Sequence, residues 1–134
     1  MSWIDEREQL DADIPEAWNL FCIAIEQTAE QFGVTAFARA EKVFAAAKRI
    51  NSCVHVVVAP IGQSSGKALD ICLDRIRRRI FSKDNEKELE SLRLERGRDG
   101  NTCLVDSHGK AVSVDRATEI FLRRFLFGED YDVE

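Results

Sequence analysis

The chain lacks a long apolar segment, a basic N-terminus and a recognisable cysteine motif. No apolar run in its 134 residues approaches the roughly 20 residues that a membrane-spanning helix needs. Residues 1–16 have neither a basic start nor an apolar stretch, so we expect no secretory signal and no membrane partner. Its cysteines are far apart and without the paired spacing of a zinc site: Cys22, Cys53, Cys72 and Cys103. We therefore expect four reduced thiols, no bound metal and a cytoplasmic location.

A strong basic charge is also missing, which argues against nucleic acid as the partner. The net charge is −5 and the isoelectric point is near 5.1. The balance is −4 over residues 1–66, +3 over 67–128 and −4 over 129–134, so acidic ends flank a mildly basic middle.

Repeats, low-complexity tracts and linkers are absent, and the length suits a single unit. With 45% apolar and 32% charged residues, the composition is that of an ordinary globular protein. We expect one α+β domain over residues 1–134, with an N-terminal arm at 1–12 and a flexible acidic tail at 129–134.

Apolar residues recur at helical spacing in four segments. Asp13 is suited to cap a helix over 14–32, with Pro15 in its first turn and Gly33 at its end. The remaining helices are expected at 35–50, at 66–81 and at 114–127, the last one capped by Ser113.

Short β segments lie between these helices. The β-branched run 54–59 predicts a central strand covered on both faces. After a polar connector at 82–91, further short strands are expected at 92–94, 102–105 and 111–112, separated by turns. The predicted order is ααβαβββα. It describes a two-layer α+β sandwich with an N-terminal helical hairpin and a short mixed or antiparallel sheet.

A Gly/Ser loop follows the predicted central strand and is the most suggestive local pattern. A strand, a loop and a helix in this order can direct backbone N–H groups and the positive end of a helix dipole at one anion. The segment 62–67, GQSSGK, is not a P-loop, because its glycines are one residue too close and Ala68 replaces the hydroxyl residue.

The same segment resembles the acyl-CoA loop of the GNAT family of N-acetyltransferases. The pattern is Pro60-x-x-Gln63-x-x-Gly66-x-Ala68, after VHVVV and before an amphipathic segment. The resemblance implies a pyrophosphate cradle made of Gln63, Ser64, Ser65, Gly66, Lys67 and Ala68. The simpler interpretation is a connection in which Ser64 or Ser65 caps the next helix and binds no ligand.

A basic run within the predicted helix 66–81 is a second candidate site. Arg75, Arg78 and Arg79 would share one helix face and could contact phosphates or an acidic protein surface. The alternative is a solvated face whose arginines pair with Asp70, with Asp74 or with the acidic tail. Interleaved aromatic residues are missing, so a stacking platform for bases is not expected.

No set of residues converges on a catalytic arrangement, and catalytic residues stay unknown. His55 lies within the central strand, on the same side as Cys53, and we expect it to be buried and hydrogen-bonded. His108 is expected in a turn.

These observations favour a small cytosolic protein that binds another protein, as an adaptor, regulator or inhibitor. One alternative is an enzyme of the acetyltransferase type that holds acyl-CoA or a nucleotide phosphate in the loop Gln63–Ala68. Another is nucleic-acid contact through Arg75–Arg79. No cofactor is expected under the first hypothesis, and CoA under the second. A homodimer stays open, because some aromatic residues (Phe44 among them) could form a partner patch.

Overall fold

The computed structural model describes residues 3–38, 43–60 and 66–127. In chain order its elements are α1 (Trp3–Ala38), β1 (Val43–Ile50), β2 (Cys53–Pro60), β3 (Lys67–Asp74), β4 (Arg79–Asp84), β5 (Lys87–Arg96), β6 (Thr102–Val105), β7 (Ala111–Val112) and α2 (Val114–Phe127).

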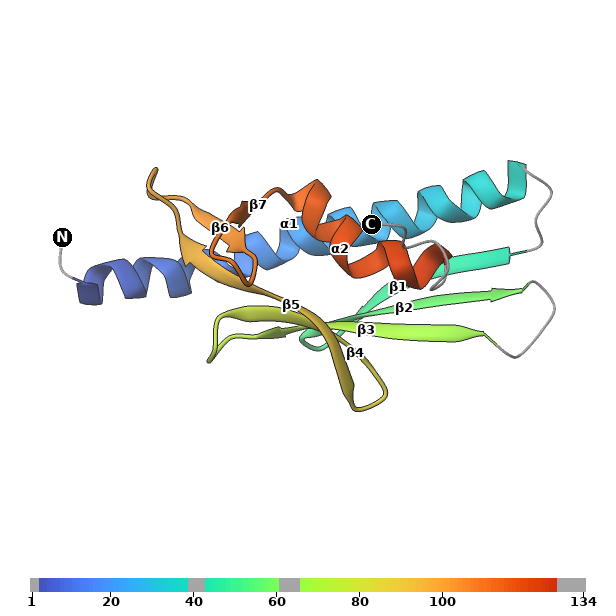
Figure 1. Cartoon of the computed structure of the whole chain (residues 1–134), viewed down its shortest axis with the longest axis horizontal. Helices are drawn as coiled ribbons and strands as arrows, with labels where there is room; N and C mark the ends of the chain where they lie inside the picture. The colour runs from blue at the N-terminus through green and yellow to red at the C-terminus, as the bar shows by residue number, and fades with distance from the viewer. Residues whose placement is uncertain (1–2, 39–42, 61–65, 128–134) are drawn as a thin grey trace.

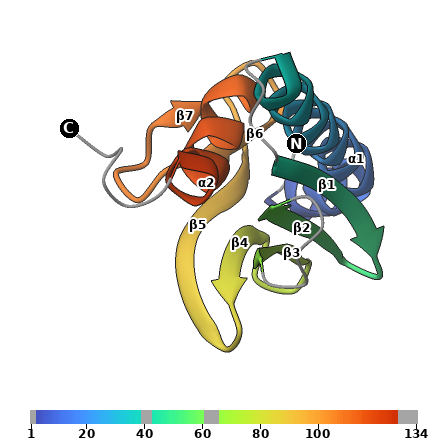
Figure 2. The same cartoon turned by 90° about the vertical axis from the view of Figure 1, so that its right-hand side faces the viewer.

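The strands form one antiparallel sheet in which each strand pairs with the next one along the chain. The sheet curls around α2, and α1 runs along β1 at the open side of the curl (Figures 1 and 2). The first strand of the sheet is β1, which lies at its edge, and α1 runs along this strand.

The predicted helical hairpin is wrong, because residues 43–50 form β1 instead of a helix. The predicted helix 14–32 lies within α1, which begins at Trp3 and therefore includes most of the predicted arm. Gly33 does not end this helix. Its missing side chain leaves a Cβ position 3.8 Å from the carbonyl oxygen of Ala45, so glycine lets α1 approach the backbone of β1 closely.

The predicted helix 66–81 is also wrong, since β3, a turn at 75–78 and β4 occupy this segment. Its apolar residues alternate along β3, with Leu69 and Ile71 buried. The connector predicted at 82–91 belongs to the hairpin of β4 and β5. The two-layer sandwich with a short sheet is thus replaced by a seven-stranded curled sheet.

The remaining predicted elements are confirmed. The run 54–59 lies in β2, residues 102–105 and 111–112 are β6 and β7, and 114–127 is α2. Ser113 caps α2 as predicted, because its hydroxyl oxygen accepts a hydrogen bond from the backbone N–H of Arg116 at 3.1 Å. The predicted tail 129–134 lies outside the described residues.

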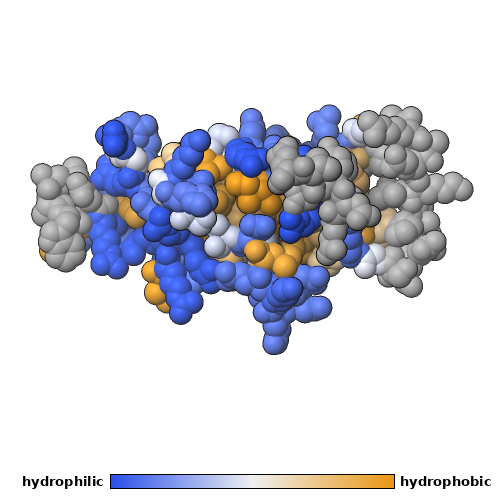
Figure 3. Space-filling view, in the orientation of Figure 1, coloured by the Kyte–Doolittle hydropathy of each residue, from blue (hydrophilic) through white to orange (hydrophobic). Residues whose placement is uncertain are grey.

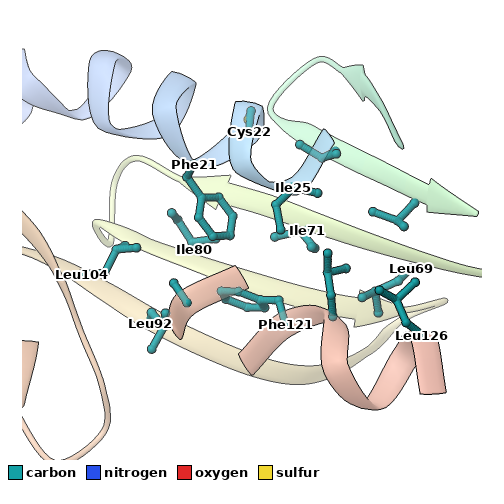
Figure 4. Close-up of a cluster of buried hydrophobic side chains, with 14 of the residues drawn as sticks. Phe21, Cys22, Ile25, Leu69, Ile71, Ile80, Leu92, Leu104, Phe121 and Leu126 are labelled. Atoms are coloured by element: carbon teal, nitrogen blue, oxygen red, sulfur yellow. The ribbon is translucent and has the colours of Figure 1, made fainter. Parts of the chain in front are cut away.

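The core fills the space between the two helices and the concave side of the sheet. Phe21 and Ile25 of α1 meet Phe121 of α2 and the sheet residues Ile71 and Ile80 (Figure 4). The rings of Phe21 and Phe121 pack edge to face with their centroids 5.6 Å apart. Neither helix of the described residues covers the convex side of the sheet.

Candidate functional site

The predicted phosphate loop lies mostly outside the described residues. Gln63, Ser64 and Ser65 are among those left out, and the structure describes Gly66 and Lys67. A Cβ on Gly66 would come within 2.6 Å of the side chain of Ala59 and 2.7 Å of the carbonyl oxygen of Val58. Close packing against β2 therefore explains this glycine without a ligand.

The chain continues from this loop into β3 and not into a helix. The helix N-terminus that the acyl-CoA interpretation needs is therefore missing from the described residues around the loop. Lys67 is the first residue of β3, and its ammonium lies 5.2 Å from the ring centroid of Phe125 in α2. The predicted helix cap by Ser64 or Ser65 and the predicted pyrophosphate cradle both required a helix after the loop. The structure has the strand β3 in that place.

The predicted arginine face is divided between a turn and a strand. Arg75 begins the turn between β3 and β4, and Arg78 ends it with a φ of 51°. Arg78 donates two hydrogen bonds to Asp11 of α1, from Nε at 2.7 Å and from Nη2 at 2.8 Å. Arg79 lies on β4 and pairs with Glu88 at 2.8 Å and with Asp74 at 3.8 Å. The structure therefore does not bring these three guanidinium groups together as one basic surface.

His55 and Asp70 form a hydrogen-bonded pair on the side of the sheet that faces away from the helices. They are opposite each other in the register of β2 and β3, and Nδ1 of His55 lies 2.7 Å from Oδ1 of Asp70. The predicted hydrogen bond of His55 is confirmed, but its predicted burial is wrong, because the side chain is 39% exposed. Lys48 lies opposite His55 on β1, and Lys83 lies opposite Asp70 on β4. We call these four residues the charged row.

Cys53 and Cys72 form a disulfide beside the charged row, which corrects the expectation of four free thiols. They are opposite each other on β2 and β3. The sequence interpretation placed Cys72 on a helix, where it had no neighbouring cysteine. Strand pairing instead brings together two residues that are 19 positions apart.

On β1 and β2 the charged row crosses an otherwise apolar surface. Side chains alternate along a strand, so every second residue of β1 and β2 shares the side of His55. Apart from Lys48 and His55, these residues are all apolar: Phe44, Ala46, Ile50, Cys53, Val57 and Ala59. Together with the charged row they form what we call the outer face. Both described helices lie on the opposite side of the sheet (Figure 2).

A shallow groove between α1 and α2 is a further candidate site. Its volume is about 490 Å³, and Leu122 and Leu126 contribute apolar lining. Figure 3 shows hydrophobic surface in the middle of the view where the helices lie. The hydroxyl groups that line it are already used, because Thr28 donates to the carbonyl of Ala24 and Thr118 donates to that of Val114. This groove offers no hydroxyl group aimed at a ligand.

The two free cysteines are poorly suited to nucleophilic chemistry. Burial raises the pKa of the Cys22 thiol to about 11. Burial, and next the neighbouring carboxylates of Glu95 and Asp99, raise the pKa of the Cys103 thiol. Reactive cysteines need the opposite shift of the pKa.

Metal-ligand clusters and membrane-spanning helices are both missing from the described residues. They contain no group of three or more His, Cys, Asp or Glu side chains that could hold a metal ion. None of the helices in this part of the chain is long and apolar enough to cross a membrane.

Comparison of the chain with protein-family models, with curated proteins and with solved structures gives no match. The functional argument therefore rests on the residues and their arrangement. Sequence reasoning missed the charged row, the disulfide and the outer face, because each depends on the register of strands that had been assigned to helices.

Proposed function

We propose that the protein acts by binding another protein through the outer face, as an adaptor, regulator or inhibitor. The observation that supports this proposal is the apolar character of β1 and β2 on both of their sides. Antiparallel strands with one solvated side normally alternate apolar and polar residues. Strands that are apolar on both sides are typical of sheets covered on both faces.

The inner side of β2 accounts for only half of its apolar residues. Val54, Val56 and Val58 are buried against the helices. Val57 and Ala59 lie on the other side of the sheet, where both are partly exposed and no helix of the described residues covers them. An uncovered apolar area of this kind on a sheet is characteristic of a protein–protein contact surface.

The charged row would determine how the partner is oriented on the outer face. Lys48 and Lys83 lie at the two ends of the His55–Asp70 pair, and Lys48 lies on β1 between the apolar residues Ala46 and Ile50. A complementary partner has apolar side chains on both sides of a strip of carboxylates. Charges in such positions mainly set orientation and specificity, while the apolar contacts provide most of the affinity.

The location that we propose for this function is the cytoplasm. The Cys53–Cys72 disulfide bears on this proposed location, because reducing compartments keep most thiols free. In such a compartment the pair would be reduced for part of the time.

The test compares one variant on the outer face with one on α1. Val57→Glu places a carboxylate in the middle of the outer face, whereas Val34→Glu changes an exposed residue of α1. Each protein is immobilised and exposed to nuclease-treated lysate of the source organism. We expect one stoichiometric protein to be retained by the wild type and by Val34→Glu, and lost with Val57→Glu.

Circular dichroism provides the folding control, since both variants should melt within a few degrees of the wild type. Retention of the same proteins by all three baits would contradict the proposal. So would a wild-type bait that retains no stoichiometric protein.

A further inference from the structure

The disulfide between Cys53 and Cys72 lies on the outer face of the sheet and outside the core cluster. It joins β2 to β3, which are also held together by five further residue pairs. A disulfide between strands that already pair with each other adds stability but does not decide their register. The bond can therefore open and close while the sheet stays assembled.

The backbone pairing keeps the two cysteines opposite each other in either redox state. The N–H of Leu73 donates to the carbonyl of Ser52 at 2.8 Å, so the next pair, Cys53 and Cys72, is not hydrogen-bonded. Side chains are closest in pairs of this kind, and the Cα atoms of the two cysteines are 4.0 Å apart. Two thiols released by reduction therefore stay in contact and can form the bond again.

The two cysteines differ in their access to solvent. Cys72 is 3% exposed, and Phe81 lies opposite it on the next strand, β4. Cys53 is partly exposed. Thiol–disulfide exchange requires the attacking sulfur to reach the sulfur that it attacks, so access decides which cysteine reacts. A small molecule in solution therefore reaches Cys53 in preference to Cys72.

The charges around the two cysteines also differ. Residues two apart on a strand share a side, so His55 lies beside Cys53, with Lys48 opposite His55 on β1. Cys72 lies between two carboxylates along β3, those of Asp70 and Asp74. Cationic neighbours favour the thiolate, which is the reactive form of cysteine, and anionic neighbours disfavour it. Charge and access therefore both select Cys53 as the reactive sulfur.

We propose that Cys53 and Cys72 form a reversible thiol–disulfide exchange site for a small disulfide of the glutathione class. In the reduced chain the thiol of Cys53 gives its proton to His55, whose Nδ1 is held 2.7 Å from Oδ1 of Asp70. The thiolate attacks one sulfur of the small disulfide and forms a mixed disulfide. The other half leaves as a thiolate and takes the proton from His55.

Cys72 completes the reaction as the second cysteine. Its sulfur attacks Sγ of Cys53, the bound half leaves as a thiolate, and the proton of the Cys72 thiol passes to it. The cysteine pair is thereby oxidised by two electrons, and the small disulfide is reduced to two thiols. The reverse sequence reduces the Cys53–Cys72 bond. This site does not depend on the protein partner proposed for the outer face.

The test compares Cys72→Ser with Cys53→Ser, each reduced and then mixed with glutathione disulfide. All four cysteines lie in different tryptic peptides, so peptide masses locate any bound glutathione. We expect Cys72→Ser to bind one glutathione at Cys53, and Cys53→Ser to react at Cys72 on the order of tenfold more slowly. Equal rates at the two positions, or a faster reaction at Cys72, would overturn the proposal.

His55→Gln in the Cys72→Ser background tests the role of the imidazole. Glutamine can still donate a hydrogen bond to Asp70, but it cannot take the proton of Cys53. We expect the reaction of Cys53 at pH 7 to slow on the order of tenfold. Lys83→Gln removes a charge at the far end of the charged row and should change the rate by less than about twofold. An equal loss in both variants would overturn the role of His55.

Reversibility is measured on the wild type and on Cys103→Ser, which lacks a free thiol away from the site. Each is reduced with glutathione and then oxidised with glutathione disulfide, and alkylation followed by mass measurement counts the thiols at each stage. We expect both proteins to regain the Cys53–Cys72 bond and to stay folded throughout by circular dichroism. A reduced chain that unfolds, or one that does not form the bond again, would show a purely structural disulfide and overturn the proposal.

Discussion

At the residue scale, the pair of Asp11 and Arg78 joins two elements that are far apart in the sequence. Both oxygens of the carboxylate accept hydrogen bonds from the guanidinium, which fixes α1 against the turn between β3 and β4. Such two-point pairs are stronger than single contacts. Arg78 has a positive φ, which costs backbone energy for a residue with a side chain. The pair with Asp11 helps to offset that cost.

We expect Asp11→Asn to lower the free energy of unfolding by about 1 kcal/mol at pH 7, as for a partly exposed ion pair. The hydrogen bonds from Arg78 hold the pKa of Asp11 below its ordinary value of 3.8. A lowered pKa in the folded state means that the pair stabilises the fold above this value and loses its effect as the pH falls further.

Urea unfolding of both proteins between pH 2 and pH 7 provides the measurement. The difference between them should be constant above about pH 5 and should shrink toward zero in acid. Asp5→Asn, a change in the first turns of α1, is the control. A difference that persists unchanged below pH 3 would show that the amide acts through packing and not through charge.

At the scale of elements, local signals found the segments whose ends are marked by capping or turn residues. Helix 114–127 was predicted correctly because Ser113 starts it and its apolar residues recur at helical spacing. The strand at 102–105 was found because the turn residues 97–100 precede it.

Segments without capping or turn residues at their ends were predicted as helices where the structure has strands. Residues 35–50 contain many alanines, which favour a helix locally, but β1 gains its ladder with β2 and its contact with α1. Residues 66–81 place apolar side chains at spacings that fit either a helix or a hairpin. The turn 75–78 has no glycine, proline or asparagine to distinguish them.

Two side chains could have indicated the missed hairpins. The carboxylate of Asp74 accepts a hydrogen bond from the N–H of Arg77 at 3.1 Å, as aspartate does at the start of many turns. Asn85 has a φ of 58° in the turn between β4 and β5, a conformation that asparagine tolerates. The outer face could not be predicted without these hairpins, because it consists of residues that strand pairing alone brings together.

The hairpin of β2 and β3 is the element whose stability depends most directly on a covalent bond. The Cys53–Cys72 disulfide joins residues 19 apart and closes a loop in the unfolded chain. A bond that closes a loop of this length stabilises a fold by about 3 kcal/mol. We expect a reducing agent to lower the unfolding midpoint of the wild type in urea.

The control is Cys53→Ala/Cys72→Ala, whose midpoint should not respond to the reducing agent. Cys103→Ser changes a free thiol and should respond as the wild type does. Equal midpoints for the wild type with and without the reducing agent would contradict the expected contribution of the bond.

At the scale of the whole molecule, the two helices and the sheet share one core cluster. Residues of α1, α2 and the strands β2 to β6 all contribute to it, so none of these elements can lose its packing alone. The single domain predicted from the sequence stays a prediction, and cooperativity is the property that tests it.

The contact between Phe21 and Phe121 is suited to this test because it joins the first helix to the last. Both side chains are buried, so Phe21→Ala and Phe121→Ala should each lower the free energy of unfolding by about 3–5 kcal/mol. The double variant should lose less than the sum of the two, by about 1 kcal/mol, because the edge-to-face contact is removed by either change.

Circular dichroism follows the secondary structure, and tryptophan fluorescence follows the two tryptophans of α1, Trp3 and Trp18. Trp18 packs on Phe21 with ring centroids 6.0 Å apart. In a single cooperative unit both signals change at the same urea concentration in the wild type and in each single variant. Two separated transitions, with Phe121→Ala shifting only one of them, would mean that α2 and its strands unfold apart from α1. The shared core makes the single transition the expected result.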